Sequence, residues 1–240
     1  MIKFTNVTKK YNDFTAVDDL TFDVKKGEIV GFIGPNGSGK TTTMKLISGI
    51  IKKNSGSIIV NDLDIDKDPL KIKASIGYIS DSPDAFLRLK GIDYLNFVAD
   101  VYDVSLEDRK NRIEKYAKEF EMLEFLNNPM LSYSHGMRQK LMIISQLIHE
   151  PDVWILDEPT VGLDPKSSYT LKEMMKEHAS KGKTVFFSTH ILEIAEKLCD
   201  RVIIIFKGKK IYEGTLDELK EKYKDKSLEE IYITLIDENN

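Results

Sequence analysis

Cysteine is nearly absent from this chain of 240 residues, in which Cys199 is the single example. One cysteine excludes an intramolecular disulfide and suits a reducing compartment. It follows Leu198 at the end of a helical pattern, so we expect a buried structural thiol. The four histidines are too scattered to form a metal-ligand signature. These shortages exclude a disulfide framework and a histidine-based metal motif.

Long apolar runs are also lacking, since none approaches the roughly 20 residues that span a bilayer. The first residues, MIKFTNVTKKYND, have no apolar segment typical of a signal peptide. The formal net charge of -4 gives no overall basic field, so we expect no nucleic-acid partner. We therefore expect a soluble, cytoplasmic chain that would act on a membrane only through another chain.

What the sequence does contain is the alternating pattern of an α/β fold. Short strands broken by turns are expected in the first 30 residues. Three apolar runs after residue 152 are typical of strands buried on both faces of a parallel sheet. Between about residues 84 and 150 the periodicity is helical, which predicts an inserted α-helical subdomain. A polar linker is expected at 61–75, between two strand patterns.

The last residues, 216–240, form a charged extension. Leu228, Ile231, Tyr232 and Leu235 recur in it at helical spacing. This spacing predicts an amphipathic helix that docks on the rest of the chain, rather than a disordered tail.

The segment GPNGSGKT, from Gly34 to Thr41, fits the phosphate-loop pattern G-x-x-x-x-G-K-[ST]. A strand pattern precedes it and a helical pattern follows. Glycines let successive backbone N–H groups face one anion, and the helix N-terminus adds partial positive charge. Lys40 can reach the β- and γ-phosphates, and the Thr41 hydroxyl can ligate Mg²⁺. The sequence therefore predicts a nucleotide-phosphate site.

Two adjacent carboxylates, Asp157 and Glu158, end the apolar run VWIL. Because side chains alternate along a strand, the two can hold different roles. Asp157 is placed to bind Mg²⁺, and Glu158 to polarise the water that attacks the γ-phosphate. His190 ends another buried strand, so we expect it near the same phosphate as a donor. Solvated acids and a structural histidine are the alternatives.

In this order the motifs closely resemble the nucleotide-binding domain of ATP-binding cassette (ABC) proteins over residues 1–215, a P-loop NTPase core with an antiparallel β subdomain. GPNGSGKT is similar to the Walker A loop, WILDE to the Walker B strand, and GLD, with Asp164, to the nucleotide-contacting D-loop. His190 matches the switch histidine, and Tyr11 the aromatic residue that stacks on adenine. The resemblance implies an ATPase with ATP and Mg²⁺ as cofactors. The nucleotide-binding residues implied on this side of the site are Tyr11, Gly34, Pro35, Asn36, Gly37, Ser38, Gly39, Lys40, Thr41 and Thr42.

The segment YSHGMRQK stands where the family has its signature, close to Leu-Ser-Gly-Gly-Gln. Ser134 and Gly136 match, while Tyr133, His135 and Met137 replace Leu, Gly and Gln. The family signature binds the γ-phosphate of ATP held by the opposite subunit, which implies this role for Ser134, Gly136 and Met137. From the residues alone, Ser134 can cap a helix and Gly136 permits close approach. An ordinary capped helix is the alternative.

Asp81 is a second departure, because the family usually has glutamine there. The family loop senses Mg²⁺ and water and docks on the transmembrane partner. An aspartate keeps an oxygen ligand but adds charge and has a shorter reach. The implied metal ligands are therefore Thr41, Asp81 and Asp157, with an ordinary loop aspartate as the alternative at Asp81.

By this resemblance, two nucleotide-binding domains close head to tail around two ATP molecules, and hydrolysis reopens them. The resemblance implies that this motion would drive a multi-pass transmembrane permease, which would hold the chain at the cytoplasmic face of the membrane. The second ATP-binding subunit would be identical or related. The form Y-S-x-G-M-[KR]-Q, the residue at 81 and the segment SLEEIY resemble exporters of drugs, antibiotics and peptides whose ATPase is a separate chain.

Two other functions remain open. A non-transport ABC ATPase, such as an iron–sulfur assembly or translation-related factor, would carry the same motifs, although the translation factors usually have two cassettes in one chain. An ATP-dependent interaction module would bind ATP with little turnover. Glu158 and His190 favour an ATPase over such a module.

Overall fold

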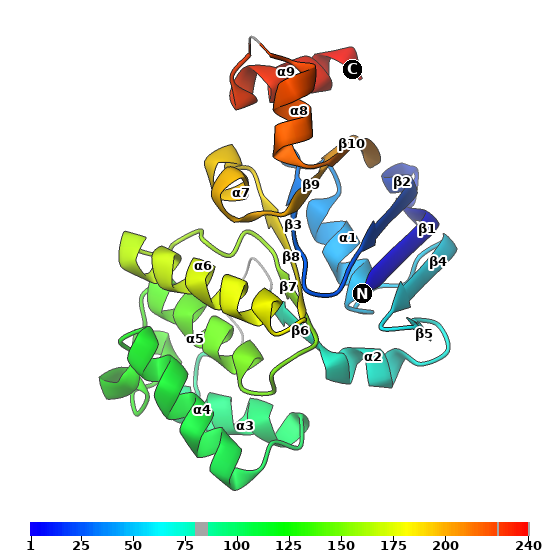
Figure 1. The fold of residues 1–240 in the computed structure, drawn as a ribbon. Helices are drawn as coiled ribbons and strands as arrows, with labels where there is room; N and C mark the ends of the chain where they lie inside the picture. Colours follow the sequence, from blue (N-terminus) through cyan, green and yellow to red (C-terminus); the bar gives the residue numbers. More distant parts are fainter. Residues whose placement is uncertain (80–85, 225, 240) are drawn as a thin grey trace.

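A six-stranded sheet forms the centre of the computed structural model, which describes residues 1–79, 86–224 and 226–239 (Figure 1). The strand order is β10-β9-β3-β8-β7-β6, and all neighbours are parallel except β10 and β9. The bounds are β3 Ile29–Ile33, β6 Ile76–Ile79, β7 Val153–Leu156, β8 Thr184–Thr189, β9 Arg201–Phe206 and β10 Lys209–Gly214.

Different layers cover the two faces of this sheet. On one face, Trp154 of β7 packs in a core with helices α5 (His135–Leu147) and α6 (Pro165–Ser180). On the other, Ile155 packs in a core with helix α1 (Lys40–Ile47). Every residue of β7 and β8 is buried, as the continuous apolar runs predicted.

A smaller antiparallel sheet lies against the α1 face, in the order β2-β1-β4-β5. Phe22 of β2 stacks on Phe186 of β8 with ring centroids 5.7 Å apart, which joins the two sheets. The bounds are β1 Ile2–Tyr11, β2 Phe14–Val24, β4 Ser55–Val60 and β5 Leu63–Asp64.

The segment 61–75 is more than the polar linker that we expected. It contains β5 and a helix, α2 (Pro69–Ser75), which buries Ile72 completely. The prediction was wrong because only one side chain of α2 enters the core, so the segment has little apolar periodicity.

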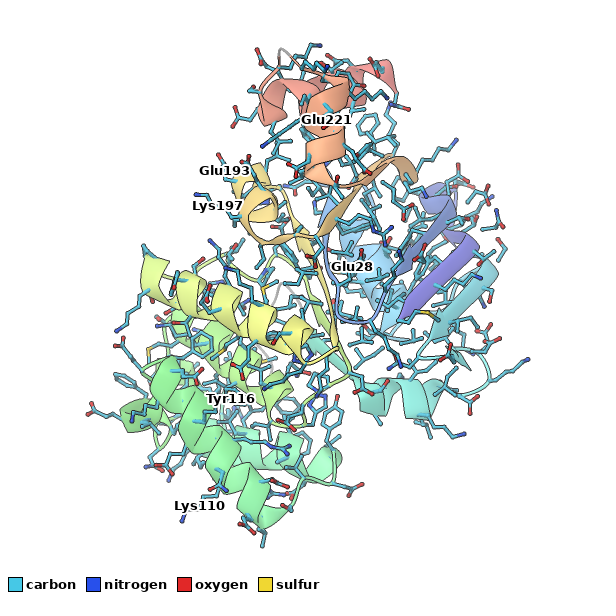
Figure 2. The ribbon with its side chains drawn as sticks, viewed as in Figure 1. Glu28, Lys110, Tyr116, Glu193, Lys197 and Glu221 are labelled. Atoms are coloured by element: carbon cyan, nitrogen blue, oxygen red, sulfur yellow. The ribbon has the colours of Figure 1, made fainter. Side chains whose placement is uncertain are left out.

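The predicted helical subdomain consists of α3 (Gly91–Val101), α4 (Leu106–Glu119) and α5, with two short 3₁₀ helices between α4 and α5. In Figure 1 these helices lie beyond α6, away from the smaller sheet. Tyr116 of α4 is buried and Lys110 of the same helix is exposed (Figure 2). Burial, reinforced by nearby carboxylates, raises the pKa of Tyr116 to about 12.

The C-terminal extension forms two helices rather than the single one expected: α8 (Leu216–Lys222) and α9 (Leu228–Glu238). They stand at the end of the molecule opposite the helical subdomain (Figure 1). Ile231 and Leu235 are buried in a core shared with β9 and α7 (Leu192–Leu198), as the helical spacing predicted.

Cys199 lies directly after α7 and packs on the backbone of β3. A Cβ atom at Gly31 would lie 2.7 Å from its Sγ atom. Burial raises the pKa of the Cys199 thiol, and the neighbouring Asp200 raises it further. Cys199 as a residue is partly rather than fully buried, and its packed thiol fits the expected structural role.

Candidate functional site

The phosphate loop joins β3 to α1 and passes close to the backbone of two other strands. A Cβ at Gly39, whose φ is +107°, would lie 2.4 Å from the Ala16 carbonyl oxygen. A Cβ at Gly34 would lie 2.5 Å from the Ile205 carbonyl oxygen. Both positions therefore require glycine. Gly39 is also the N-cap of α1 and provides no side-chain cap, so the first N–H groups of the helix can face an anion.

Lys40 lies over the curve of this loop. Its buried Nζ donates to the carbonyl oxygens of Gly34 (2.7 Å) and Pro35 (3.2 Å). The same Nζ lies 3.7 Å from Glu158 Oε1. The ammonium therefore stands between the loop and a carboxylate, where it can exchange these contacts for a phosphate.

The two carboxylates after β7 point to different partners, as predicted, although both lie beyond the end of the strand rather than on it. Asp157 is 1% exposed, and its Oδ1 accepts a 2.6 Å hydrogen bond from the Ser188 hydroxyl. Glu158 has a left-handed backbone, with φ +47°. Its Oε2 lies 3.0 Å from His190 Nδ1, and its backbone N–H donates to Ser188 Oγ at 2.9 Å. His190 thus lies beside Glu158, at the carboxyl end of the adjacent strand β8.

A cavity of about 260 Å³ unites the phosphate loop with both carboxylates. Residues separated by more than a hundred positions therefore line one site. A larger open groove of about 560 Å³ between α4 and α6 contains none of the predicted site residues, so we place the chemistry in the smaller cavity. The residues that line the smaller cavity are Phe14, Ala16, Asn36, Gly37, Gly39, Lys40, Thr41, Thr42, Asp157 and Glu158.

Hydroxyl, carboxylate and ammonium groups on this lining suit a nucleotide phosphate with a divalent cation. Thr41 and Asp157 offer oxygen ligands, which Mg²⁺ prefers, and Mg²⁺ usually takes one or two protein ligands besides phosphate oxygens. Ser38 is buried, and its Oγ has no hydrogen-bond partner among the described residues. The donor set therefore fits the cofactors expected from the sequence.

An aromatic residue that the sequence did not single out, Phe14, also lines the cavity. Tyr11 pairs with Phe14 across the β1–β2 turn but is not part of the lining. Both rings are largely exposed, at 44% for Tyr11 and 60% for Phe14. Exposed aromatic rings beside a phosphate site are candidates for stacking on a base. The sequence could have indicated Phe14 only if the turn after Tyr11 had been predicted, because that turn brings the two residues side by side.

The segment YSHGMRQK begins helix α5. Ser134 is the exposed N-cap, and its hydroxyl accepts a 3.2 Å hydrogen bond from Met137 N–H, as predicted. Tyr133 is buried and donates to the Phe125 carbonyl oxygen at 2.6 Å, so this residue anchors the segment to the helical subdomain. Ser134, Gly136 and Met137 are absent from the lining of the cavity.

Gly136 packs against the segment GLD of the same chain. A Cβ at Gly136 would lie 2.6 Å from the Gly162 carbonyl oxygen. Lys140 Nζ pairs with Asp164 Oδ2 at 2.9 Å. The backbone N–H of Ser167 lowers the pKa of Asp164, and Lys140 and the Ser167 hydroxyl lower it further. The predicted signature and D-loop are therefore in contact within one chain.

Asp81, predicted as a metal ligand, lies outside the described residues. The described strand nearest to it in sequence is β6, which pairs with β7 and ends at Ile79.

Comparison with known proteins identifies the family, because the family described as ABC transporter matches residues 17–161. The chain belongs to the ABC transporter family. The ABC transporter ATP-binding protein NatA of Bacillus subtilis is 35% identical and covers 98% of this chain and 97% of its own length. The linearmycin resistance ATP-binding protein LnrL of the same organism is 35% identical, over 91% of this chain and 70% of its own.

Solved structures agree with this assignment. The structure of an ATP-binding subunit of an ABC transporter has a TM-score of 0.93 at 33% identity, covering 98% of this chain and 99% of its own. The post-hydrolysis dimer of the cassette MJ0796, bound to ADP and Pi, has a TM-score of 0.82 at 27% identity, covering 90% and 99%. The chain is thus the ATP-binding subunit of an ABC transporter, an ATPase with the fold of the P-loop NTPases. In its described part no helix is long and apolar enough to cross a bilayer.

Proposed function

We propose that this ABC ATPase is a chain separate from its permease, powers export, and works as a head-to-tail dimer at the cytoplasmic face of the membrane. One observation carries the dimer. The cavity holds the phosphate loop and both carboxylates, but its lining includes neither the signature nor Asp164. A second copy, or a related chain, would supply those groups from its own exposed Ser134 and Asp164. The cassette MJ0796 is itself a dimer.

Each side chain would have a defined task. Backbone N–H groups between Gly34 and Thr42, except at Pro35, would hold the phosphates. The Lys40 ammonium would move from its contact with Glu158 to these phosphates. Glu158 would then accept the proton of the attacking water. His190, 3.0 Å from Glu158, would orient that carboxylate and donate to the γ-phosphate. Tyr11 would stack on the adenine.

The residues for Mg²⁺ would be Thr41 and Asp157, with Asp81 as the expected third. Bound Mg²⁺ would neutralise charge on the β- and γ-phosphates. Asp157 would keep its carboxylate fixed through Ser188. The Thr41 hydroxyl follows Lys40 at the start of α1, so both would address the same phosphates.

An exposed aromatic and aliphatic surface supports a permease partner. Phe86 and Phe97 lie with ring centroids 5.6 Å apart and are 53% and 46% exposed. Val101, also on α3, is 61% exposed. This surface begins directly after the residues around Asp81, where the family resemblance places the contact with the transmembrane chain. Exposed apolar patches of this kind mark interaction sites.

Export is supported by the amino-acid sequence of the signature and by the name of one relative. The form Y-S-x-G-M-[KR]-Q begins at Tyr133, and LnrL is named as a linearmycin resistance protein. Export of a compound is one way in which a cell becomes resistant to it. The transported compound would be chosen by the permease.

The first test is ATP turnover with and without the proposed base. Glu158→Gln removes the carboxylate but keeps the shape, so we expect hydrolysis to fall by at least about 100-fold, within the range of general-base catalysis. The variant should still bind ATP and accumulate as a dimer in size-exclusion chromatography. Turnover equal to that of the wild type would refute the assignment of Glu158.

A second test concerns the signature. Ser134→Arg should abolish the ATP-dependent dimer while ATP binding to the monomer stays unchanged, because Ser134 lies outside the cavity of its own chain. Loss of ATP binding to the monomer, or a dimer that survives, would contradict the shared site.

A third test concerns the permease. Co-purification with a multi-pass membrane protein would support the permease partner, whereas recovery with an assembly factor would favour a non-transport ATPase.

A further inference from the structure

The side chain of Ser188 hydrogen-bonds to both residues of the carboxylate pair. Its hydroxyl donates to Asp157 Oδ1 at 2.6 Å and accepts from the Glu158 backbone N–H at 2.9 Å. We propose that Ser188 is a positioning residue that sets the orientation of the metal-ligand carboxylate and of the base together. The inference rests on the proposed roles of Asp157 and Glu158.

The hydroxyl group uses its hydrogen-bonding capacity in a defined direction. A serine hydroxyl has one hydrogen to donate and two lone pairs to accept. Because a carboxylate only accepts and an amide N–H only donates, the proton of Ser188 must point to Asp157. Ser188 is 0% exposed and Asp157 is 1% exposed, so water cannot readily replace this bond. The carboxylate is therefore held in one rotation.

The second hydrogen bond fixes an unusual backbone. Glu158 has φ +47°, a conformation that costs energy for a residue other than glycine. Its N–H is held by Ser188, while its two carboxylate oxygens lie near Lys40 Nζ (3.7 Å) and His190 Nδ1 (3.0 Å). Loss of this N–H hydrogen bond would let the Glu158 backbone rotate about φ, which would move the carboxylate away from both Lys40 and His190. Ser188 thus acts on the base through its backbone.

The pairing of the strands explains why residue 188 can do this. Strands β7 and β8 are parallel, and Leu156 is paired with Phe187. The next residues along the two strands, Asp157 and Ser188, therefore lie side by side where β7 ends. The residue two positions further on, His190, reaches the same edge. One strand end supplies both the orienting hydroxyl and the histidine.

The test compares Ser188→Ala with a matched loss of a buried hydroxyl. Thr184 is also 0% exposed, on the same strand, and donates to the Lys25 carbonyl oxygen, but it lies at the end away from the carboxylates. We would measure kcat and KM for ATP, the affinity for ADP with and without Mg²⁺ by calorimetry, and the melting temperature. Thr184→Val serves as the control.

For Ser188→Ala we expect the affinity for metal-free ADP to stay within about twofold, because the phosphate loop is untouched. The Mg²⁺ concentration that half-saturates the ADP complex should rise, and kcat should fall, each by roughly 10- to 100-fold, the range for residues that orient metal ligands. Ser188→Thr retains the hydroxyl and should recover most of both. Thr184→Val should leave both unchanged.

Two results would overturn the inference. One is a folded Ser188→Ala variant with wild-type Mg²⁺ dependence and kcat, and the other is an equal loss in Thr184→Val, which would show a structural effect alone. Should Ser188→Ala not fold, Ser188→Cys keeps the shape with a weak donor and gives the same comparison. Glu158→Gln tests the proposed function separately from the inference about Ser188. Wild-type turnover in Glu158→Gln would refute the proposed base, whatever the result for Ser188.

Discussion

At the scale of single residues, two aromatic side chains beside the cavity, Tyr11 and Phe14, are the candidates for stacking on the base. Stacking of a base on an aromatic ring contributes about 1–3 kcal/mol, so Tyr11→Ala should weaken ATP binding by roughly 5- to 150-fold. Phe14→Ala is the matched comparison, because the two residues pair across one turn. Fluorescence titration of an ATP analogue would measure both. A loss confined to Phe14→Ala would assign the stacking to the ring that lines the cavity.

The predictable residues of the site were those whose partners are close in sequence. The phosphate loop and the adjacent pair Asp157 and Glu158 each carry their chemistry within a few positions. Ser188 gave no such signal, because its role depends on the register between β7 and β8. For Gly136 the sequence indicated only that another group approaches closely. It did not indicate which group, because Gly162, whose carbonyl oxygen lies against Gly136, is 26 positions away in the same chain.

At the scale of elements, the ion pair between Lys140 and Asp164 connects the start of α5 to the start of α6. Asp164 is half exposed in its side chain, so the pair should contribute less than about 1 kcal/mol to stability. However, the starts of α5 and α6 would both contact the second subunit in the proposed dimer. Lys140→Met should therefore weaken ATP-driven dimerisation several-fold, measured by analytical ultracentrifugation, with little change in the melting temperature.

Lys166→Met is the control for Lys140→Met, because it removes an exposed ion pair to Glu121 from the same helix α6. We expect wild-type dimerisation for this control. If both variants dimerise equally well, the link between the signature and the D-loop does not contribute to the shared site.

Elements were predictable from sequence where their apolar pattern is continuous or regular. Strands β3, β7, β8 and β9 of the central sheet and helix α4 have such patterns. Strand β10 has no buried residue and α2 has only one, and both were missed. The break between α8 and α9 was missed although a signal was present. Ser227 and Glu230 form a capping box, S-x-x-E, which marks the start of a helix inside the charged extension.

At the scale of the whole molecule, the partly buried His149 and the buried His178 connect its layers and should make stability depend on pH. His149 stacks on Tyr102, with ring centroids 3.7 Å apart, and its Nε2 lies 3.3 Å from the Ile76 carbonyl oxygen. His178 of α6 packs against Trp154 of β7. Burial, with nearby cationic side chains such as Lys183, lowers the pKa of each histidine from 6.5 to about 4.

The unfolded chain therefore binds more protons than the folded chain between about pH 6.5 and pH 4, and stability falls as the pH decreases through this window. The full effect is on the order of 3 kcal/mol for each histidine. Urea unfolding at pH 7.5 and pH 5 would measure it. Carboxylates with lowered pKa values, such as Glu28, lose their stabilising contribution only as the pH falls further, below the pKa of an unfolded glutamate, so they do not cause a decrease near pH 5.5. His178→Gln should flatten the profile in this window, and an unchanged slope would show that the pKa of His178 is the same in the folded and the unfolded chain.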